Sequence, residues 1–232
     1  MNQIDEKLKI LIFSNKYQTM IEQIYKNVNT VPSKNNLFRA FELSPLSKTK
    51  VVIVGQDPYY IKGMADGLAF STNLNIMPKS LKNIFWEIKN EYPNIKLNSY
   101  SLVEWAKQGV LLLNTILTTE VNKPLIHKQY WSTFILDIIN LINCYKENVV
   151  FVLWGKEAQK LSNFINKEKH KILSSPHPSP LSASKGFFGN NHFILINKYL
   201  KQTNQREINW NILNKNNKMQ NKISNNDASN YS

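Results

Sequence analysis

Short apolar runs alternate with longer amphipathic stretches along most of the chain. Four of the runs are candidate strands, and they lie at residues 51–54, 110–113, 149–153 and 171–173. The first three are apolar throughout, without alternation of apolar and polar positions. This pattern is typical of strands that are buried on both faces of a parallel sheet.

Apolar residues at helical spacing fill the intervals between these runs. The clearest stripe recurs at i, i+3, i+4 and i+7 and consists of Leu81, Ile84, Phe85 and Ile88. It predicts a helix that opens at residues 78–80 with Ser80 as its N-cap. Further helices are predicted near residues 17–26, 37–43, 131–142, 156–166 and 192–201.

The order of these elements predicts the fold class. Strands that alternate with helices indicate an α/β protein, a single domain with a central four-stranded parallel sheet flanked by helices on both faces. The predicted catalytic domain spans residues 1–212. After about Ile212 the composition collapses to Asn, Lys, Ser and Gln, so residues 213–232 are predicted to be a polar, disordered tail.

An unusual polar motif follows each predicted strand. The motifs are Gln56-Asp57, Asn114, Gly155 and His177. The carboxyl ends of parallel strands meet at one edge of the sheet, so these four motifs are expected to converge in one cleft.

The loop that carries His177 is dominated by prolines at positions 176, 178 and 180. A residue that precedes proline is pushed toward an extended conformation, so this loop is expected to be stiff and to present its side chains rigidly. Leu181 has no apolar neighbour nearby in the sequence. It is either a buried anchor or an exposed wedge that enters a stack of bases, and the sequence leaves both readings open.

The net charge of +13 indicates a polyanionic partner, with nucleic acid first and an anionic membrane second. The tail contributes only +2, although a general lysine bias could supply part of the remaining +11. No apolar stretch approaches the roughly 20 residues that span a bilayer, which argues against a membrane partner. The amino terminus lacks the basic-then-apolar order of a signal peptide. A single cysteine, Cys144, fits a reducing compartment, and a cytoplasmic location is expected.

Several chemical classes lack their motifs in this sequence. There is no Walker loop and no dinucleotide-binding glycine motif, and the four histidines show no metal-ligand spacing. A nucleoside triphosphatase or a zinc enzyme is therefore disfavoured, and we expect neither a metal nor an organic cofactor.

Five segments carry a clear resemblance to a known family. Residues 55–59, 67–71, 111–115, 153–155 and 177–182 resemble, in order, the signature segments of family 1 uracil-DNA glycosylases. The resemblance covers roughly residues 20 to 212. It implies an enzyme that hydrolyses the bond between uracil and deoxyribose in DNA and leaves an abasic site. It also suggests that the protein is a monomer. The target nucleotide would be flipped out of the stack, because its reactive bond is otherwise inaccessible.

The resemblance also implies a role for each site residue. Asp57 would activate water and stabilise positive charge on the sugar, and His177 would donate a hydrogen bond to uracil O2. The remaining uracil contacts would come from the Gln56 backbone, from Tyr59 against C5, from Phe70 stacked on the base, and from Asn114 at the N3 and O4 edge. The residues implied in DNA contact are Ser80, Gly155, Ser179, Leu181, Ser182 and Lys185.

The sequence departs from the usual pattern of that family at a few positions. Tyr60 stands where the family usually has histidine, and Ile61-Lys62 replaces its usual Gly-Pro. Lys79, Lys156 and Lys185 replace a proline, a serine and an arginine. These positions surround the expected backbone contacts rather than the uracil pocket.

Two other functions are compatible with parts of the pattern. A non-catalytic module that binds damaged DNA would share the basic charge and Leu181, but it would not need Asp57 and His177 together. A hydrolase acting on another nucleobase or on a free nucleoside would need neither Leu181 nor the serines that would hold the DNA backbone.

Overall fold

A four-stranded sheet forms the centre of the molecule, in a computed structural model that describes residues 2–213. Its strands, in spatial order, are β3 (Val110–Asn114), β2 (Val51–Gly55), β5 (Val150–Trp154) and β6 (Lys171–Ser175). All three strand pairs are parallel, and Val54 lies opposite both Leu113 and Leu153. The predicted α/β class and its central parallel sheet are confirmed.

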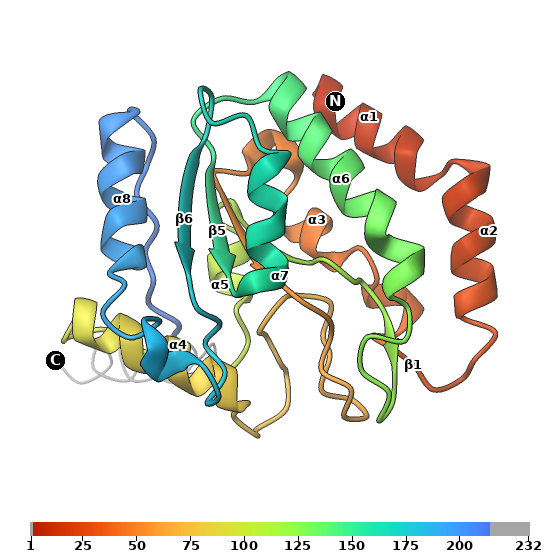
Figure 1. Cartoon of the computed structure of the whole chain (residues 1–232), viewed down its shortest axis with the longest axis horizontal. Helices are drawn as coiled ribbons and strands as arrows, with labels where there is room; N and C mark the ends of the chain where they lie inside the picture. Colours follow the sequence, from red (N-terminus) through yellow and green to blue (C-terminus); the bar gives the residue numbers. More distant parts are fainter. Residues whose placement is uncertain (1, 214–232) are drawn as a thin grey trace, which may run out of the picture.

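Helices cover both faces of this sheet. Figure 1 shows α8 on one side of β5 and β6, and α6 and α7 on the other side. The helices are α1 (Gln3–Ile12), α2 (Asn15–Ile24), α3 (Arg39–Leu43), α4 (Lys79–Glu91), α5 (Val103–Ala106), α6 (Lys128–Tyr145), α7 (Lys156–Gln159) and α8 (His192–Gln202). A separate two-stranded ribbon joins β1 (Thr30–Val31) to β4 (Thr119–Glu120). The predicted polar tail lies outside the described residues from position 214 onward.

The amino-terminal region contains one helix more than the sequence predicted. Helix α1 precedes α2, which occupies residues 15–24 instead of the predicted 17–26. Its buried side chains are Ile4, Leu8 and Ile12, a narrow stripe at i, i+4 and i+8. Such a narrow apolar stripe among lysines is a weak sequence signal for a helix. The helix is stabilised because α6 lies beside α1 and covers this stripe.

Two predicted helix ends are wrong. Helix α4 begins at Lys79 directly after Pro78, so Ser80 is its second residue and makes no capping hydrogen bond. Proline suits this position because its fixed φ fits the start of a helix and it lacks the N–H that would need a partner. The helix predicted over residues 156–166 is the single turn of α7 followed by a 3-10 turn, Lys160–Asn163.

Helix α4 holds the chain segment that runs from the His177 loop (residues 176–182) to the start of α8. Three side chains of α4, spaced one helical turn apart, form hydrogen bonds with the backbone of this segment. They are Asn83, which donates to the Pro178 carbonyl (2.7 Å); Glu87, which accepts from the Gly189 N–H (2.8 Å); and Glu91, which accepts from the Ile194 N–H (2.6 Å). In Figure 1 this segment passes directly across α4.

Glu91 makes the stability of this contact dependent on pH. Burial raises its pKa from 4.5 to about 7, and its Oε1 atom is buried without a hydrogen-bond partner. Because the folded-state pKa is the higher one, ionisation favours the unfolded chain, and stability falls as pH rises from about 4.5 to about 7. We expect Glu91→Gln to raise the thermal midpoint relative to the parent at pH 8 more than at pH 5.

Thermal denaturation of the parent protein and of Glu91→Gln at pH 5 and pH 8 measures this difference. Glu104→Gln, at a half-buried glutamate of α5, is the matched control and is expected to show no such trend. An equal effect of Glu91→Gln at pH 5 and pH 8 would contradict the assignment.

Candidate active site

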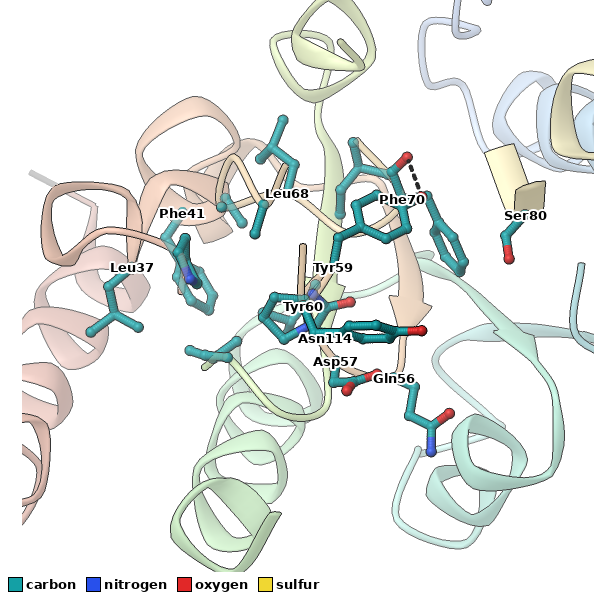
Figure 2. Close-up of a pocket in the computed structure, with 18 of the residues that line it drawn as sticks. Leu37, Phe41, Gln56, Asp57, Tyr59, Tyr60, Leu68, Phe70, Ser80 and Asn114 are labelled. Carbon is teal, nitrogen blue, oxygen red and sulfur yellow. Dashed lines mark hydrogen bonds between the residues drawn. The ribbon is translucent and has the colours of Figure 1, made fainter. Parts of the chain in front are cut away.

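A cavity of about 150 Å³ opens at the carboxyl edge of the sheet. Its lining includes most of the residues that the sequence singled out, namely Gln56, Asp57, Tyr59, Tyr60, Phe70, Ser80, Asn114 and His177. Figure 2 shows Asp57, Tyr59 and Asn114 grouped near its middle, with Ser80 on a separate side at the start of α4. The structure therefore brings together motifs that lie more than 100 residues apart in the sequence.

Gly55 allows the amide of Asn114 to enter this cavity. The two residues are register partners at the ends of β2 and β3. A Cβ atom on Gly55 would lie 2.2 Å from Asn114 Oδ1 and 2.9 Å from the Ala69 Cβ, so a side chain there would displace the Asn114 amide. The Asn114 amide makes no hydrogen bond to any other described residue, and it therefore offers both a donor and an acceptor to a ligand.

Asp57 is half-buried just after β2, and its carboxylate is fixed in place. Its Oδ2 atom accepts a hydrogen bond of 3.0 Å from the Leu125 N–H. Burial raises the pKa of Asp57 above its ordinary value of 3.8, while the bond from Leu125 opposes that rise. Leu125 has a left-handed backbone, with φ +64°, and nothing in its sequence context indicated that it would touch the site.

The structure determines which nitrogen of His177 carries the proton. The Ser179 N–H donates to His177 Nδ1 over 3.0 Å, so Nδ1 is an acceptor and the proton of the neutral ring is on Nε2. Burial lowers the pKa of His177 below 6.5, which keeps the ring neutral at pH 7. The side chain is thus a neutral donor that lines the cavity.

Gly155 makes room for this histidine. It has φ +92°, and a Cβ atom there would lie 2.9 Å from the Cβ of His177. The resemblance implied a DNA contact for Gly155. The geometry adds a second requirement for glycine, because any side chain would displace His177 from the cavity.

The ring of Phe70 closes one wall of the cavity. Its backbone is left-handed, with φ +64°, and its carbonyl accepts a hydrogen bond of 3.1 Å from the Tyr59 hydroxyl. The ring centroid lies 5.9 Å from that of His177 and 5.7 Å from that of Trp154. Tyr59 and Phe70 therefore hold each other in position.

A buried carboxylate, Asp66, holds the loop that carries Phe70. It accepts hydrogen bonds from the Ser71 hydroxyl (2.7 Å) and the Leu68 N–H (3.1 Å), and it forms an ion pair with Arg39 at 3.3 Å. Sequence reasoning assigned no role to Asp66. Its position between Gly63 and Gly67 in a loop beside the candidate site was the only available signal.

One backbone group of Gln56 is hydrogen-bonded to the segment that follows β3. Its carbonyl accepts from the Ile116 N–H (2.9 Å) and from the Thr115 hydroxyl (2.8 Å). Its N–H has no hydrogen-bond partner among residues 2–213. The group of Gln56 that can meet a ligand is therefore the N–H and not the carbonyl.

The structure decides between the two roles predicted for Leu181. Its side chain is 86% exposed, so it is not a buried anchor. The turn beneath it is closed by the Ser182 hydroxyl, which donates to the His177 carbonyl (2.8 Å), and by a 3.0 Å contact between the hydroxyls of Ser179 and Ser182. The loop is stiff for this reason as well as for its prolines.

The departures from the family pattern were predicted to surround the backbone contacts rather than the uracil pocket, and this prediction is wrong for Tyr60. Lys79, Lys156 and Lys185 are exposed, and the first two directly flank Ser80 and Gly155. Tyr60 lines the cavity and is 45% exposed. Lysine therefore adds positive charge beside Ser80 and Gly155, and Tyr60 adds an aromatic ring to the lining of the cavity.

Residues 2–213 contain neither a metal-binding cluster nor a membrane-spanning helix. No three His, Cys, Asp or Glu side chains in this range are grouped so that they could share a metal ion. No helix in this range has the length and apolar character needed to cross a bilayer.

Comparisons with known proteins identify the family of this chain. Residues 41–201 match the uracil DNA glycosylase superfamily. The uracil-DNA glycosylase of Mycoplasmopsis pulmonis is 48% identical over 201 residues, which cover 86% of this chain and 91% of that protein, and that of Escherichia coli is 45% identical over 85% and 88%. The crystal structure of mimivirus uracil-DNA glycosylase is 30% identical, with a TM-score of 0.76 and coverage of 88% of this chain and 89% of that one. The chain therefore belongs to the uracil-DNA glycosylase superfamily.

Proposed function

We propose that this protein removes uracil from DNA by hydrolysing the N-glycosidic bond, which releases free uracil and leaves an abasic site. The observation that carries the proposal is that Asp57 and His177, from the ends of β2 and β6, line the same cavity as the free amide of Asn114. The names of the relatives support the same activity. This cavity belongs to a domain that we assign to residues 1–212.

The cavity offers uracil a complementary set of contacts. Phe70 would stack on the base, and the Asn114 amide would accept from N3–H and donate to O4. The free N–H of Gln56 would donate to a carbonyl of the ring. Tyr59 would stand against C5 and leave no room for the methyl group of thymine.

Bond cleavage separates charge, and the two catalytic residues face opposite signs of it. As the bond between C1′ and N1 breaks, positive charge grows on the sugar and negative charge grows on uracil. The Asp57 carboxylate would stabilise the sugar cation and accept a proton from the water whose oxygen bonds to C1′. The His177 Nε2–H would donate to uracil O2, and the released base would then be reprotonated by solvent.

The target nucleotide must leave the base stack to reach this cavity. Leu181, at the tip of a stiff loop, would fill the space that the base vacates. Contacts to the DNA backbone would come from Ser80, Gly155, Ser179, Ser182 and Lys185. The hydroxyl of Ser80 makes no hydrogen bond within the described residues, whereas those of Ser179 and Ser182 bond to each other.

The direct test is release of uracil from a DNA duplex that contains one uracil, with EDTA present and no cofactor added. We expect free uracil and an abasic strand. Binding of this duplex without release would favour the non-catalytic binding module. Release from free deoxyuridine but not from DNA would favour a nucleoside hydrolase. We expect a monomer that acts in the cytoplasm, and sedimentation of the purified chain tests the first of these.

Tyr59→Ala is expected to admit thymine. The change removes the ring at C5 and also the hydrogen bond to the Phe70 carbonyl, so both specificity and the rate on uracil should change. Release of thymine from a duplex with one T·G mismatch is the measurement. Tyr60→Ala removes the neighbouring ring, which is 45% exposed, and should release no thymine. If Tyr59→Ala also releases none, Tyr59 is not the filter.

A further inference from the structure

Trp86 is the one exposed tryptophan among the five in the chain. Its side chain is 50% exposed on α4, whereas the other four tryptophans are at most 2% exposed. Exposure of a tryptophan to water is unfavourable in free energy, since burial of its large apolar surface against a partner is favourable. No element of the described structure covers its exposed half.

Trp86 forms one rigid unit with Phe188, which we name the aromatic ledge. The two ring centroids are 4.4 Å apart, with an angle of 61° between the ring planes. The segment that carries Phe188 is fastened to α4 on either side of this contact, by Asn83 to the Pro178 carbonyl and by Glu87 to the Gly189 N–H. The ledge is therefore fixed relative to the His177 loop and its exposed Leu181.

The ledge lies on the same helix as Ser80, which we propose as a contact to the DNA backbone. Ser80 lines the cavity, and Trp86 follows it by six residues on the same helix, about 9 Å along the axis. That distance corresponds to two to three nucleotides at about 3.4 Å each along one strand. The exposed charged side chains nearest in sequence to the two rings are Lys82, Lys89 and Lys185, and all are positive.

We propose that the aromatic ledge binds an unpaired base of the DNA strand near the target uracil, by stacking on Trp86. The lysines would hold the flanking phosphates. Exposed aromatic rings among basic residues are the usual platform for single-stranded nucleic acid, because every base has a face that can stack. In a duplex the bases are already stacked on one another, so the ledge favours single-stranded substrates. This inference rests on the proposed function for its DNA path.

Tryptophan fluorescence tests the proposal, because Trp86 alone among the five is exposed to a stacking base or to a soluble quencher. The full chain is titrated with a uracil-free single-stranded oligodeoxynucleotide and with a duplex of the same length. We expect the single strand to quench the fluorescence and to protect it from acrylamide. In Trp86→Ala the quenching should disappear, and the dissociation constant for the single strand should rise about fivefold or more.

Phe164→Ala is the matched control, since Phe164 is also 50% exposed, follows the 3-10 turn Lys160–Asn163 and does not line the cavity. It should leave binding unchanged. Absence of quenching by the single strand, or quenching that persists in Trp86→Ala, would overturn the proposal. So would an equal loss of single-strand and duplex binding in Trp86→Ala. Quenching without any uracil release would instead remove the proposed function and leave the ledge as a DNA contact.

Discussion

Asp57→Asn is expected to lower the rate of uracil release by about 100- to 10,000-fold, the usual contribution of a positioned acid or base. Asparagine is neutral, so it can neither stabilise the positive sugar nor take a proton from the attacking water. It keeps an oxygen that can accept the hydrogen bond from the Leu125 N–H. The fold and the binding of uracil-containing DNA should therefore survive the change.

Single-turnover release from a duplex with one uracil measures the loss, and binding of the same duplex to the variant measures what remains. Asp137→Asn is the matched control, because its carboxylate accepts from the Tyr17 hydroxyl (2.6 Å) and does not line the cavity. Full activity of Asp57→Asn would show that the carboxylate is not part of the chemistry. A parallel loss of DNA binding would show that the change disrupts the site as a whole.

His177→Ala is expected to lower the rate by about 100- to 1000-fold, the cost of removing one fixed donor from a developing anion. Alanine removes the Nε2–H that faces the cavity and also the Nδ1 acceptor of the Ser179 N–H. His177→Gln separates the two effects, because the glutamine amide keeps a donor at a similar reach. We expect the glutamine variant to be the more active of the two in the same single-turnover assay. Equal losses would indicate that the histidine shapes the loop rather than donating to uracil.

The pH dependence of kcat/KM tests the protonation states assigned to Asp57 and His177. Release requires an ionised Asp57, whose pKa is raised by burial, and a neutral His177, whose pKa is lowered by burial. Activity should thus fall on the acidic side at a pH above 3.8, the ordinary pKa of Asp57, and protonation of His177 should contribute only below pH 6.5. A limb centred below pH 3.8 would contradict the raised pKa of Asp57.

The sequence was most informative where one physical rule acts locally. The apolar residues 51–54 predict a buried strand, and parallel strands bring their carboxyl ends to one edge. From these two rules alone Asp57, Asn114 and His177 were expected to meet, and all three line one cavity. Local rules failed where another part of the chain determined the structure. The narrow apolar stripe of α1 is buried only because α6 lies beside it, and Pro78 takes the N-cap position of α4 that was predicted for Ser80.

The sequence by itself determined the class of fold, the edge of the sheet that carries the site and the chemical groups present there. Tertiary structure alone decided the state of those groups. The proton of His177 is on Nε2 because the Ser179 N–H occupies Nδ1, and the carboxylate of Asp57 is aimed by the distant Leu125. Leu181 is exposed because nothing packs over its turn, a fact that its neighbours in sequence could not specify. Protonation, aim and exposure all depend on atoms that are remote along the chain, so only the folded molecule defines them.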